Sequence, residues 1–421
     1  MSVRLVISVW GDPKRQEVSY KINDHIHTGR YNSTQVIGDQ FDARLTVFIP
    51  ISLIDACGMG LGPDLQAAKT VEYIKQFYPD KNLEVIPAPS VGTFKIDNRV
   101  INFKGNLGIF KVYSFYKILG IFEGIKEDLE LYVDLTYGIN YMSMANYDAI
   151  KLAASLYCAL YDKKTNITAM NSDPFTANTG TTPIRINTIE KLNFDREIGI
   201  NYITGELRGK FDKNRFKWSR IAGKKDTTMV DTNDIKSLFI GMNSFGAFLP
   251  CLVKNEQMRT YMDSVESIMK YFEDSVLKDL YYAHNMYEYK FSLDENIILI
   301  FSALKILTMD LFTNTGALAP LKKLENLSKT TFSLNIARYL LNEEIKKIKD
   351  CGERLEEGKL VLYRTLKGED TPKKPCGSNS RILIAHCALE MNTTYLMKKQ
   401  GEILLGYGEC LRGIIAALKK M

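Results

Sequence analysis

The chain has 421 residues, of which 45% are apolar and 25% charged, with a formal net charge of +6 at pH 7. This length accommodates two or three domains, and the composition is that of a globular protein rather than a disordered or fibrous one. No apolar run of 18 residues occurs, and residues 1–9 read as a strand rather than a signal peptide. We therefore expect a cytoplasmic protein without a membrane span.

The first 190 residues alternate apolar strand-like runs with helical patterns. Core strands are predicted at 4–9, 45–49, 83–86, 129–134, 167–172 and 184–189, with a further strand at 17–22 and a hairpin at 93–103. Helices are predicted at 63–77, 107–125 and 142–161. Buried strands separated by helices predict a mostly parallel, Rossmann-like α/β sheet.

Ligands of such sheets bind beyond the carboxyl ends of the strands. Here the strand ends carry small and polar residues, which suit a nucleotide or its phosphates, although each loop could simply form a turn. The candidate ligand-binding residues are Trp10, Gly11, Asp12, Ser52, Ser90, Thr136, Gly138 and Asn140. The glycines of 58–62 are spaced one residue too closely for G-x-G-x-x-G, and no P-loop occurs, which disfavours a hydride-transfer enzyme or an NTPase.

Residues 205–226 contain eight Lys or Arg residues interleaved with Phe211, Phe216 and Trp218. Cations and aromatic rings can grip RNA by phosphate contact and base stacking, but a solvated linker is the alternative. From Asp231 onward the pattern predicts helices at 235–253, 256–280, 293–315, 333–348 and from 380 to the end, with a loop at 358–375.

Charge is distributed unevenly between the two halves. Residues 1–190 contain 19 Lys and Arg against 20 Asp and Glu, and the whole-chain totals of 55 and 49 leave 36 against 29 for residues 191–421. The first half therefore has a net charge of −1 and the second of +7. This excess favours a polyanionic partner for the second half.

Seven scattered cysteines form no Cys-x-x-Cys pair, which indicates reduced thiols with neither a disulfide framework nor a zinc site. His25 and His27 have no third metal-ligand neighbour, so no metal is expected. Cys387 directly follows His386, but adjacent helical residues point apart, which favours packing over a nucleophilic thiol.

Arg381 and His386 are the candidate catalytic residues. Residues 375–380 read as a loop ending in a helix N-cap, after which the pattern is apolar and helical through Leu389 and Met391. Arginine can bind phosphate and stabilise charge on it, and histidine can transfer a proton near neutral pH. Residues five apart on a helix are about 140° apart in rotation, so the spacing alone does not place both on one face.

The strand running into Asp134-Leu-Thr-Tyr-Gly-Ile-Asn140, followed by a helical half with Arg381 and His386, resembles the CARF–HEPN ribonucleases of type III CRISPR systems. The resemblance implies a CARF domain at 1–204, a basic linker at 205–232 and a HEPN domain at 233–421. It also implies a CARF dimer that binds a cyclic oligoadenylate, often the tetramer, and a metal-free composite RNase site. Many HEPN motifs place a polar residue directly after the arginine, whereas this sequence has Ile382.

Together these features predict an endoribonuclease that cleaves single-stranded RNA when a cyclic oligoadenylate binds. Arg381 would stabilise the phosphate charge, and His386 would move a proton or orient the 2′-hydroxyl. Two alternatives stay open. In a ring nuclease, Thr136 and Asn140 would help to cleave the activator itself, and in a non-catalytic sensor the protein would act through binding alone.

Overall fold

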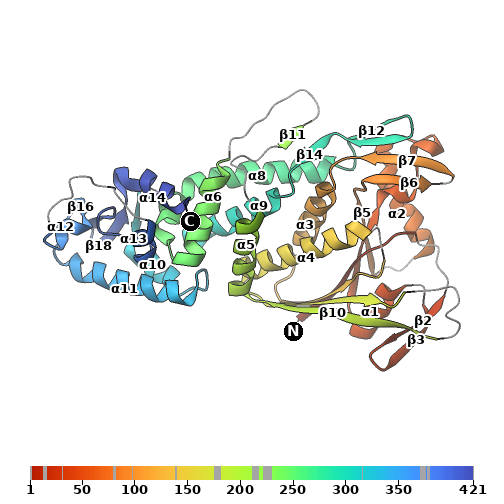
Figure 1. The fold of residues 1–421 in the computed structure, drawn as a ribbon, viewed down its shortest axis with the longest axis horizontal. Helices are drawn as coiled ribbons and strands as arrows, with labels where there is room; N and C mark the ends of the chain where they lie inside the picture. Colours follow the sequence, from red (N-terminus) through yellow and green to blue (C-terminus); the bar gives the residue numbers. More distant parts are fainter. Residues whose placement is uncertain are drawn as a thin grey trace. The chain divides into compact units, whose positions relative to one another are not determined.

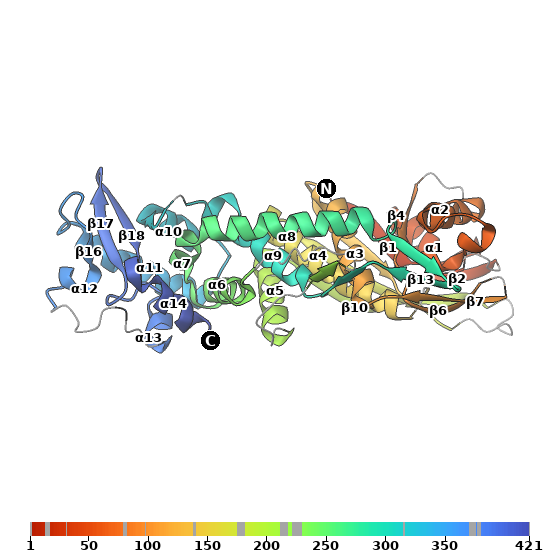
Figure 2. The same ribbon diagram turned by 90° about the horizontal axis from the view of Figure 1, so that it is seen from above.

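The structure is a computed structural model that describes residues 2–12, 17–30, 32–78, 82–96, 98–137, 140–174, 182–210, 218–220, 230–314, 316–369, 376 and 380–420. The chain divides into two compact units (Figures 1 and 2). The first comprises Met1–Asp195, Lys217–Thr227 and Ser267–Ile297, and the second comprises Arg196–Phe216, Thr228–Glu266 and Ile298–Met421. The chain therefore returns to the first unit within one helix, α8 (Asn255–Ser275).

An eight-stranded sheet forms the centre of the first unit, in the order β3-β2-β10-β9-β8-β1-β4-β5. Its strands are β1 (Ser2–Val9), β2 (Val18–Ile22), β3 (His25–Arg30), β4 (Arg44–Pro50), β5 (Leu83–Ala88), β8 (Asp128–Asp134), β9 (Thr165–Ser172) and β10 (Ile184–Phe194). The five strands from β9 to β5 are all parallel. The predicted Rossmann-like sheet is thus confirmed, and β3 is a strand that the sequence pattern did not predict.

Helices cover both faces of this sheet: α1 (Ser33–Phe41), α2 (Gln66–Phe77), α3 (Gly108–Glu123) and α4 (Asn140–Tyr161). Val47 and Ile49 of β4 share a core cluster with residues of α1 and α2. The intervening Phe48 instead packs against Phe110 of α3, with 6.4 Å between ring centroids. Since successive strand residues point to opposite faces, α1 and α2 cover one face and α3 the other.

A second sheet in this unit has the order β12-β13-β7-β6. Its strands are β6 (Gly92–Ile96), β7 (Arg99–Lys104), β12 (Leu280–Ala283) and β13 (Met286–Tyr289), and β14 (Phe291–Leu293) pairs separately with β11 (Trp218–Arg220). The hairpin predicted at 93–103 is confirmed, but the helix predicted to reach 280 ends at Ser275. His284 and Asn285 have φ of 51° and 57°, which is the backbone of a tight hairpin turn.

The second unit is mainly helical. Its helices are α5 (Arg196–Lys210), α6 (Thr232–Phe245), α7 (Phe248–Val253), the first part of α8, α9 (Ile297–Leu307), α10 (Leu321–Ser328), α11 (Asn335–Gly352), α12 (Tyr363–Leu366), α13 (Ser380–Ala385) and α14 (Leu411–Leu418). A small sheet, ordered β15-β18-β17-β16, joins β15 (Leu318–Pro320), β18 (Glu402–Gly406), β17 (Tyr395–Lys399) and β16 (Val361–Leu362).

The continuous helix predicted from residue 380 to the end is wrong, because the β17–β18 hairpin interrupts it. Gln400 and Gly401 form the turn of this hairpin, with left-handed φ of 51° and 80°. The basic segment 205–226 lies largely outside the described residues. No described helix is both long and apolar enough to cross a membrane.

The expectation that every cysteine is a free thiol is also wrong. Cys376 and Cys410 form a disulfide, with 4.8 Å between their Cα atoms. The two residues are 34 positions apart, and Cys410 lies in a short 3-10 turn, Gly408–Cys410, directly before α14. Pairing over such a separation depends on where the fold places the two Cα atoms, so spacing alone could not reveal it.

Candidate functional site

The topology of the parallel sheet brings the predicted ligand loops to one edge. β4 and β5 lie on one side of β1, whereas β8 and β9 lie on the other, so the strand order reverses at β1. In sheets of this kind the ligand crevice opens beyond the carboxyl ends of the strands at such a reversal. Residues 10–12 follow β1 and residues 135–137 follow β8, and α4 begins at Asn140, shortly after β8 in the chain.

A buried carboxylate supports the loop after β8. Asp134 is 1% exposed, and its Oδ2 accepts hydrogen bonds from the hydroxyls of Ser33 and Thr34, both at 2.6 Å. Its Oδ1 accepts from the backbone N–H of Thr136 at 2.9 Å. The Thr136 hydroxyl in turn accepts from Ser172 N at 3.0 Å. Asp134 therefore joins the start of α1 to the loop that carries Thr136.

The remaining candidates at the ends of β1 and β8 differ in exposure. Trp10 is 3% exposed, stacks obliquely on Tyr78 at 4.9 Å and donates its indole N–H to the Thr34 hydroxyl at 2.8 Å. Its ring is thus part of the core cluster, so only the backbone of Trp10 and the residues after it reach the end of β1. Gly11 is half-buried and Asp12 is exposed. Gly138 and the side chain of Asn140 lie outside the described residues.

Ser52 and Ser90 follow β4 and β5, and the structure joins them. Ser52 N donates to Ser90 Oγ at 3.2 Å, and both residues are buried. The hydroxyl of Tyr289 on β13 accepts from Ser90 N at 2.8 Å and donates to Ser90 O at 2.9 Å. Burial raises the pKa of Tyr289 well above its ordinary value, so this hydroxyl keeps its proton. The two serines therefore connect neighbouring loops beneath a tyrosine.

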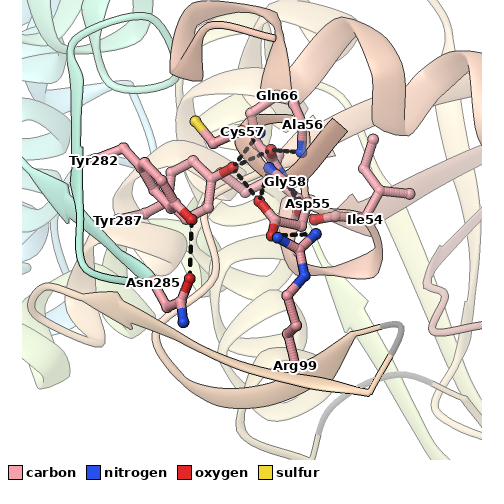
Figure 3. Close-up of polar contacts among 11 residues, drawn as sticks. Ile54, Asp55, Ala56, Cys57, Gly58, Gln66, Arg99, Tyr282, Asn285 and Tyr287 are labelled. Carbon is pink, nitrogen blue, oxygen red and sulfur yellow. Dashed lines mark hydrogen bonds and ion pairs between the residues drawn. The ribbon is translucent and has the colours of Figure 1, made fainter. Parts of the chain in front are cut away.

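A second tyrosine of β13 holds the loop that follows Ser52 (Figure 3). The Tyr287 hydroxyl lies 2.8 Å from Asp55 Oδ1 and 2.9 Å from Gln66 Oε1, and it accepts from Cys57 N at 3.0 Å. Asp55 Oδ1 also accepts from Gly58 N at 2.9 Å. Burial raises the pKa of the Tyr287 phenol above its ordinary range. One side chain of β13 therefore forms hydrogen bonds with the segment 55–57 and with Gln66, both far from β13 in sequence.

Arg99 forms an ion pair with Asp55 in this network and accounts for the glycine at position 58. Its Nη2 lies 2.9 Å from Asp55 Oδ2, an ion pair without hydrogen-bond alignment (Figure 3). A Cβ on Gly58 would come within 1.6 Å of that same Nη2, so the guanidinium occupies the space that a side chain would need. Glycine at position 58 is therefore explained by the packing of Arg99 against this turn.

Tyr289→Phe should lower the stability of the first unit by about 1–3 kcal/mol, the usual cost of leaving buried polar groups unpaired. The reason is that Ser90 would lose its partner for both backbone groups at a site that water does not reach. Denaturant unfolding of the full chain measures the change. Tyr281→Phe is the matched control, because Tyr281 lies on the neighbouring strand and is 54% exposed. Equal effects of the two variants would contradict the prediction.

The second candidate site lies in the second unit, on α13 and the turn after it. α13 exposes Arg381 and Ile382 and buries Leu383. The helix ends at Ala385, so the predicted continuation through Leu389 is wrong, and His386 lies just beyond the last helical residue. Cys387 and Ala388 cause this ending, since their φ of 51° and 65° are left-handed. The capping residues expected at 377–379 lie outside the described residues.

Contacts on both sides hold this turn in place. Cys387 is fully buried, and its thiol donates to the backbone oxygen of Ala337 on α11 at 3.6 Å. Burial, with a smaller contribution from the nearby Glu344 charge, raises the pKa of Cys387 to about 12. The predicted packing role of this cysteine is therefore confirmed. The Tyr407 hydroxyl donates to Ala388 O at 2.7 Å, which anchors the next residue.

His386 has a partner that the sequence did not reveal. Its Nδ1 lies 3.1 Å from Oε1 of Glu344 on α11, whose side chain is only 6% exposed, whereas the His386 side chain is 41% exposed. Lys347 Nζ lies 2.6 Å from the same carboxylate oxygen. Glu344 precedes His386 by 42 positions. It is one of several charged residues in its helix, so the sequence gave no indication that it contacts His386.

Family models match both halves of the chain. Residues 5–174 match the CARF domain of CRISPR system endoribonuclease Csx1, and residues 334–409 match its HEPN domain. The CARF match contains the strand-end loops described above, and the HEPN match contains Glu344, Arg381 and His386.

The CRISPR system endoribonuclease Csx1 of Methanocaldococcus jannaschii is 26% identical over 256 residues, which cover 59% of this chain. The aligned region spans 53% of that relative, or about half of its length. The solved structure of Enterococcus italicus Csm6 bound to cyclic hexa-2′-fluoro-hexa-dAMP aligns with 99% of this chain and 94% of its own at 10% identity. Its TM-score of 0.28 is too low to establish a common overall arrangement.

The two matched domains occur in the order expected from the sequence, with the α/β sheet first and the helical region second. Residues 5–174 therefore belong to the CARF domain family, and residues 334–409 to the HEPN domain family, of CRISPR system endoribonuclease Csx1.

Proposed function

We propose that the protein is an endoribonuclease that cleaves single-stranded RNA when a cyclic oligoadenylate binds to its CARF domain. One observation carries the proposal: within the HEPN-matched segment, an exposed arginine is followed by a half-exposed histidine whose Nδ1 is held by a buried carboxylate. Such a histidine leaves Nε2 available at the surface for proton transfer. Arg381 adds the cation that a phosphate requires.

In this mechanism the ribose 2′-hydroxyl attacks the adjacent phosphorus. His386 accepts or relays the proton of that hydroxyl, and Arg381 stabilises the charge that develops on the phosphate oxygens. The bond to the 5′-oxygen breaks, and that oxygen takes up a proton. The products are a 2′,3′-cyclic phosphate and a free 5′-hydroxyl.

The activator would bind at the crevice between the ends of β1 and β8. The N-terminus of α4 lies there, and free helix N–H groups favour phosphates. A two-fold homodimer can bind a cyclic ligand of matching symmetry, and a tetra-adenylate ring fits that requirement. The same dimer would bring two α13 segments together as a composite site. Activation then requires the ligand to bind more tightly to the dimer arrangement that cleaves RNA.

The direct test is an RNase assay on a single-stranded substrate, with and without cyclic oligoadenylates of four and six units. We expect cleavage to rise with one ring size while the linear oligoadenylates have little effect. The same reactions should be examined for loss of the ring, since degradation of the activator without RNA cleavage would favour a ring nuclease. Absence of both activities would contradict the proposal.

Cleavage should persist in EDTA and leave 2′,3′-cyclic phosphate ends, because a guanidinium and an imidazole supply the charge stabilisation and the proton transfer. Mass spectrometry of the products identifies the ends, and the chelated rate is compared with the rate in magnesium. Cleavage that stops in EDTA and returns with magnesium would refute the metal-independent mechanism.

A further inference from the structure

We propose that Glu344 is a positioning residue of the nuclease site, which holds His386 by Nδ1 so that Nε2 faces the RNA. The proposal rests on the proposed function of His386. The distance from Glu344 Oε1 to His386 Nδ1 is 3.1 Å. The pair comes from two elements 42 positions apart, so it exists only in the folded second unit.

The contact with the Glu344 carboxylate selects which ring nitrogen of His386 carries the proton. An ionised carboxylate only accepts hydrogen bonds, so its partner at 3.1 Å must donate, and Nδ1 of His386 carries the hydrogen. In the neutral ring, Nε2 is then the acceptor, which is the form that takes a proton from a 2′-hydroxyl. Lys347 lies on the exposed rim of the pair, with 48% of its side chain accessible, and partly balances the buried charge.

Two residues of α11 contact the turn that follows α13. Ala337 accepts the hydrogen bond from the Cys387 thiol, and Glu344 binds the ring of the adjacent His386. These two positions on α11 are seven residues apart, which is two helical turns and therefore the same face. Cys387 and Ala388 have left-handed φ, which is unfavourable for residues other than glycine. These contacts and the hydrogen bond from Tyr407 hold them in that conformation.

The carboxylate also has an electrostatic role during the reaction. As the proton moves to His386, positive charge develops on the ring in the transition state, and the Glu344 carboxylate 3.1 Å from Nδ1 lies where it can stabilise that charge. This interaction is stronger in the transition state than before it. Loss of Glu344 should therefore act on kcat rather than on KM.

The experiment compares Glu344→Ala, Glu344→Gln and Glu343→Gln with the parent in the full chain, at saturating cyclic oligoadenylate. We expect Glu344→Ala to lower kcat by about 10- to 100-fold, the usual cost of removing a group that orients a reactive histidine. KM and activator affinity should change by less than about threefold, since Glu344 touches neither ligand. Glu344→Gln keeps an acceptor for Nδ1–H but no charge, so we expect an intermediate loss. Glu343→Gln is the matched control, because Glu343 is the exposed neighbouring carboxylate on α11, and it should retain kcat within about threefold.

A spectroscopic measurement separates positioning from general folding. In protein labelled with ¹⁵N-histidine, only four histidines contribute, and the His386→Ala variant assigns one of them. We expect His386 of the parent to show the Nδ1–H form and the Glu344→Ala variant to show a mixture of both forms. If Glu344→Ala fails to fold, the test relies on Glu344→Gln. A kcat of Glu344→Gln equal to that of the parent would overturn the electrostatic role of Glu344.

Failure of this proposal is distinguishable from failure of the proposed function. If His386→Ala abolishes cleavage while both Glu344 variants match the parent, His386 acts without a positioning carboxylate. If His386→Ala itself cleaves normally, the nuclease site lies elsewhere and the proposed function fails.

Discussion

His386→Ala lowers the rate of RNA cleavage at saturating activator by about 10²-fold or more, the usual loss when a general acid–base group is removed. The affinity for the cyclic oligoadenylate stays at the parent value, because His386 belongs to the second unit and the activator loops to the first. The measurement is a single-turnover cleavage rate, paired with activator binding by calorimetry.

A matched control is available in the same chain. His25→Ala removes an exposed imidazole at the start of β3, and we expect it to cleave like the parent. Arg381→Ala should reproduce the loss, since the phosphate would lose its cation. Near-normal cleavage by both the Arg381 and His386 variants would place the site elsewhere.

Asn140→Ala weakens binding of the cyclic activator by roughly 10- to 100-fold, the equivalent of one lost hydrogen bond to a charged group. Asn140 is the first residue of α4, beside the reversal of strand order where β1 and β8 end. Amide groups and the N–H groups of a helix N-terminus can both bind phosphate, which is why we expect this residue to contribute. The concentration needed for half-maximal RNase activation should rise in proportion, whereas the rate at saturation should change little.

Asn166→Ala serves as the control for this variant. Asn166 is exposed on β9, paired with Glu130 near the amino ends of the parallel strands and therefore at the opposite edge of the sheet. It should bind the activator like the parent. Parent-like affinity and activation of the Asn140 variant would mean that the activator does not use this edge.

Local sequence patterns determined the architecture of the first unit. Apolar runs such as 129–134, separated by helical stretches, already indicate a parallel sheet, because strands covered on both faces need apolar residues at successive positions. Polar residues directly after such runs indicate the ligand edge, because all parallel strands end on the same side. The same reasoning selected Thr136 and Asn140, which stay predictions. It could not reveal that Trp10 and Ser90 are buried, because their burial depends on neighbours from other elements.

The tertiary structure alone decided which distant residues meet. Tyr287 and Tyr289 lie between two segments with helical periodicity, so the sequence did not indicate the strand that carries them. They nevertheless form hydrogen bonds with loops about 200 positions earlier. Likewise, Arg381 and His386 are visible in the sequence, whereas the turn that ends α13 and the carboxylate of Glu344 are not. Periodicity reports how each segment contacts the core, but the partner of a side chain depends on the packing of whole elements, which no local pattern encodes.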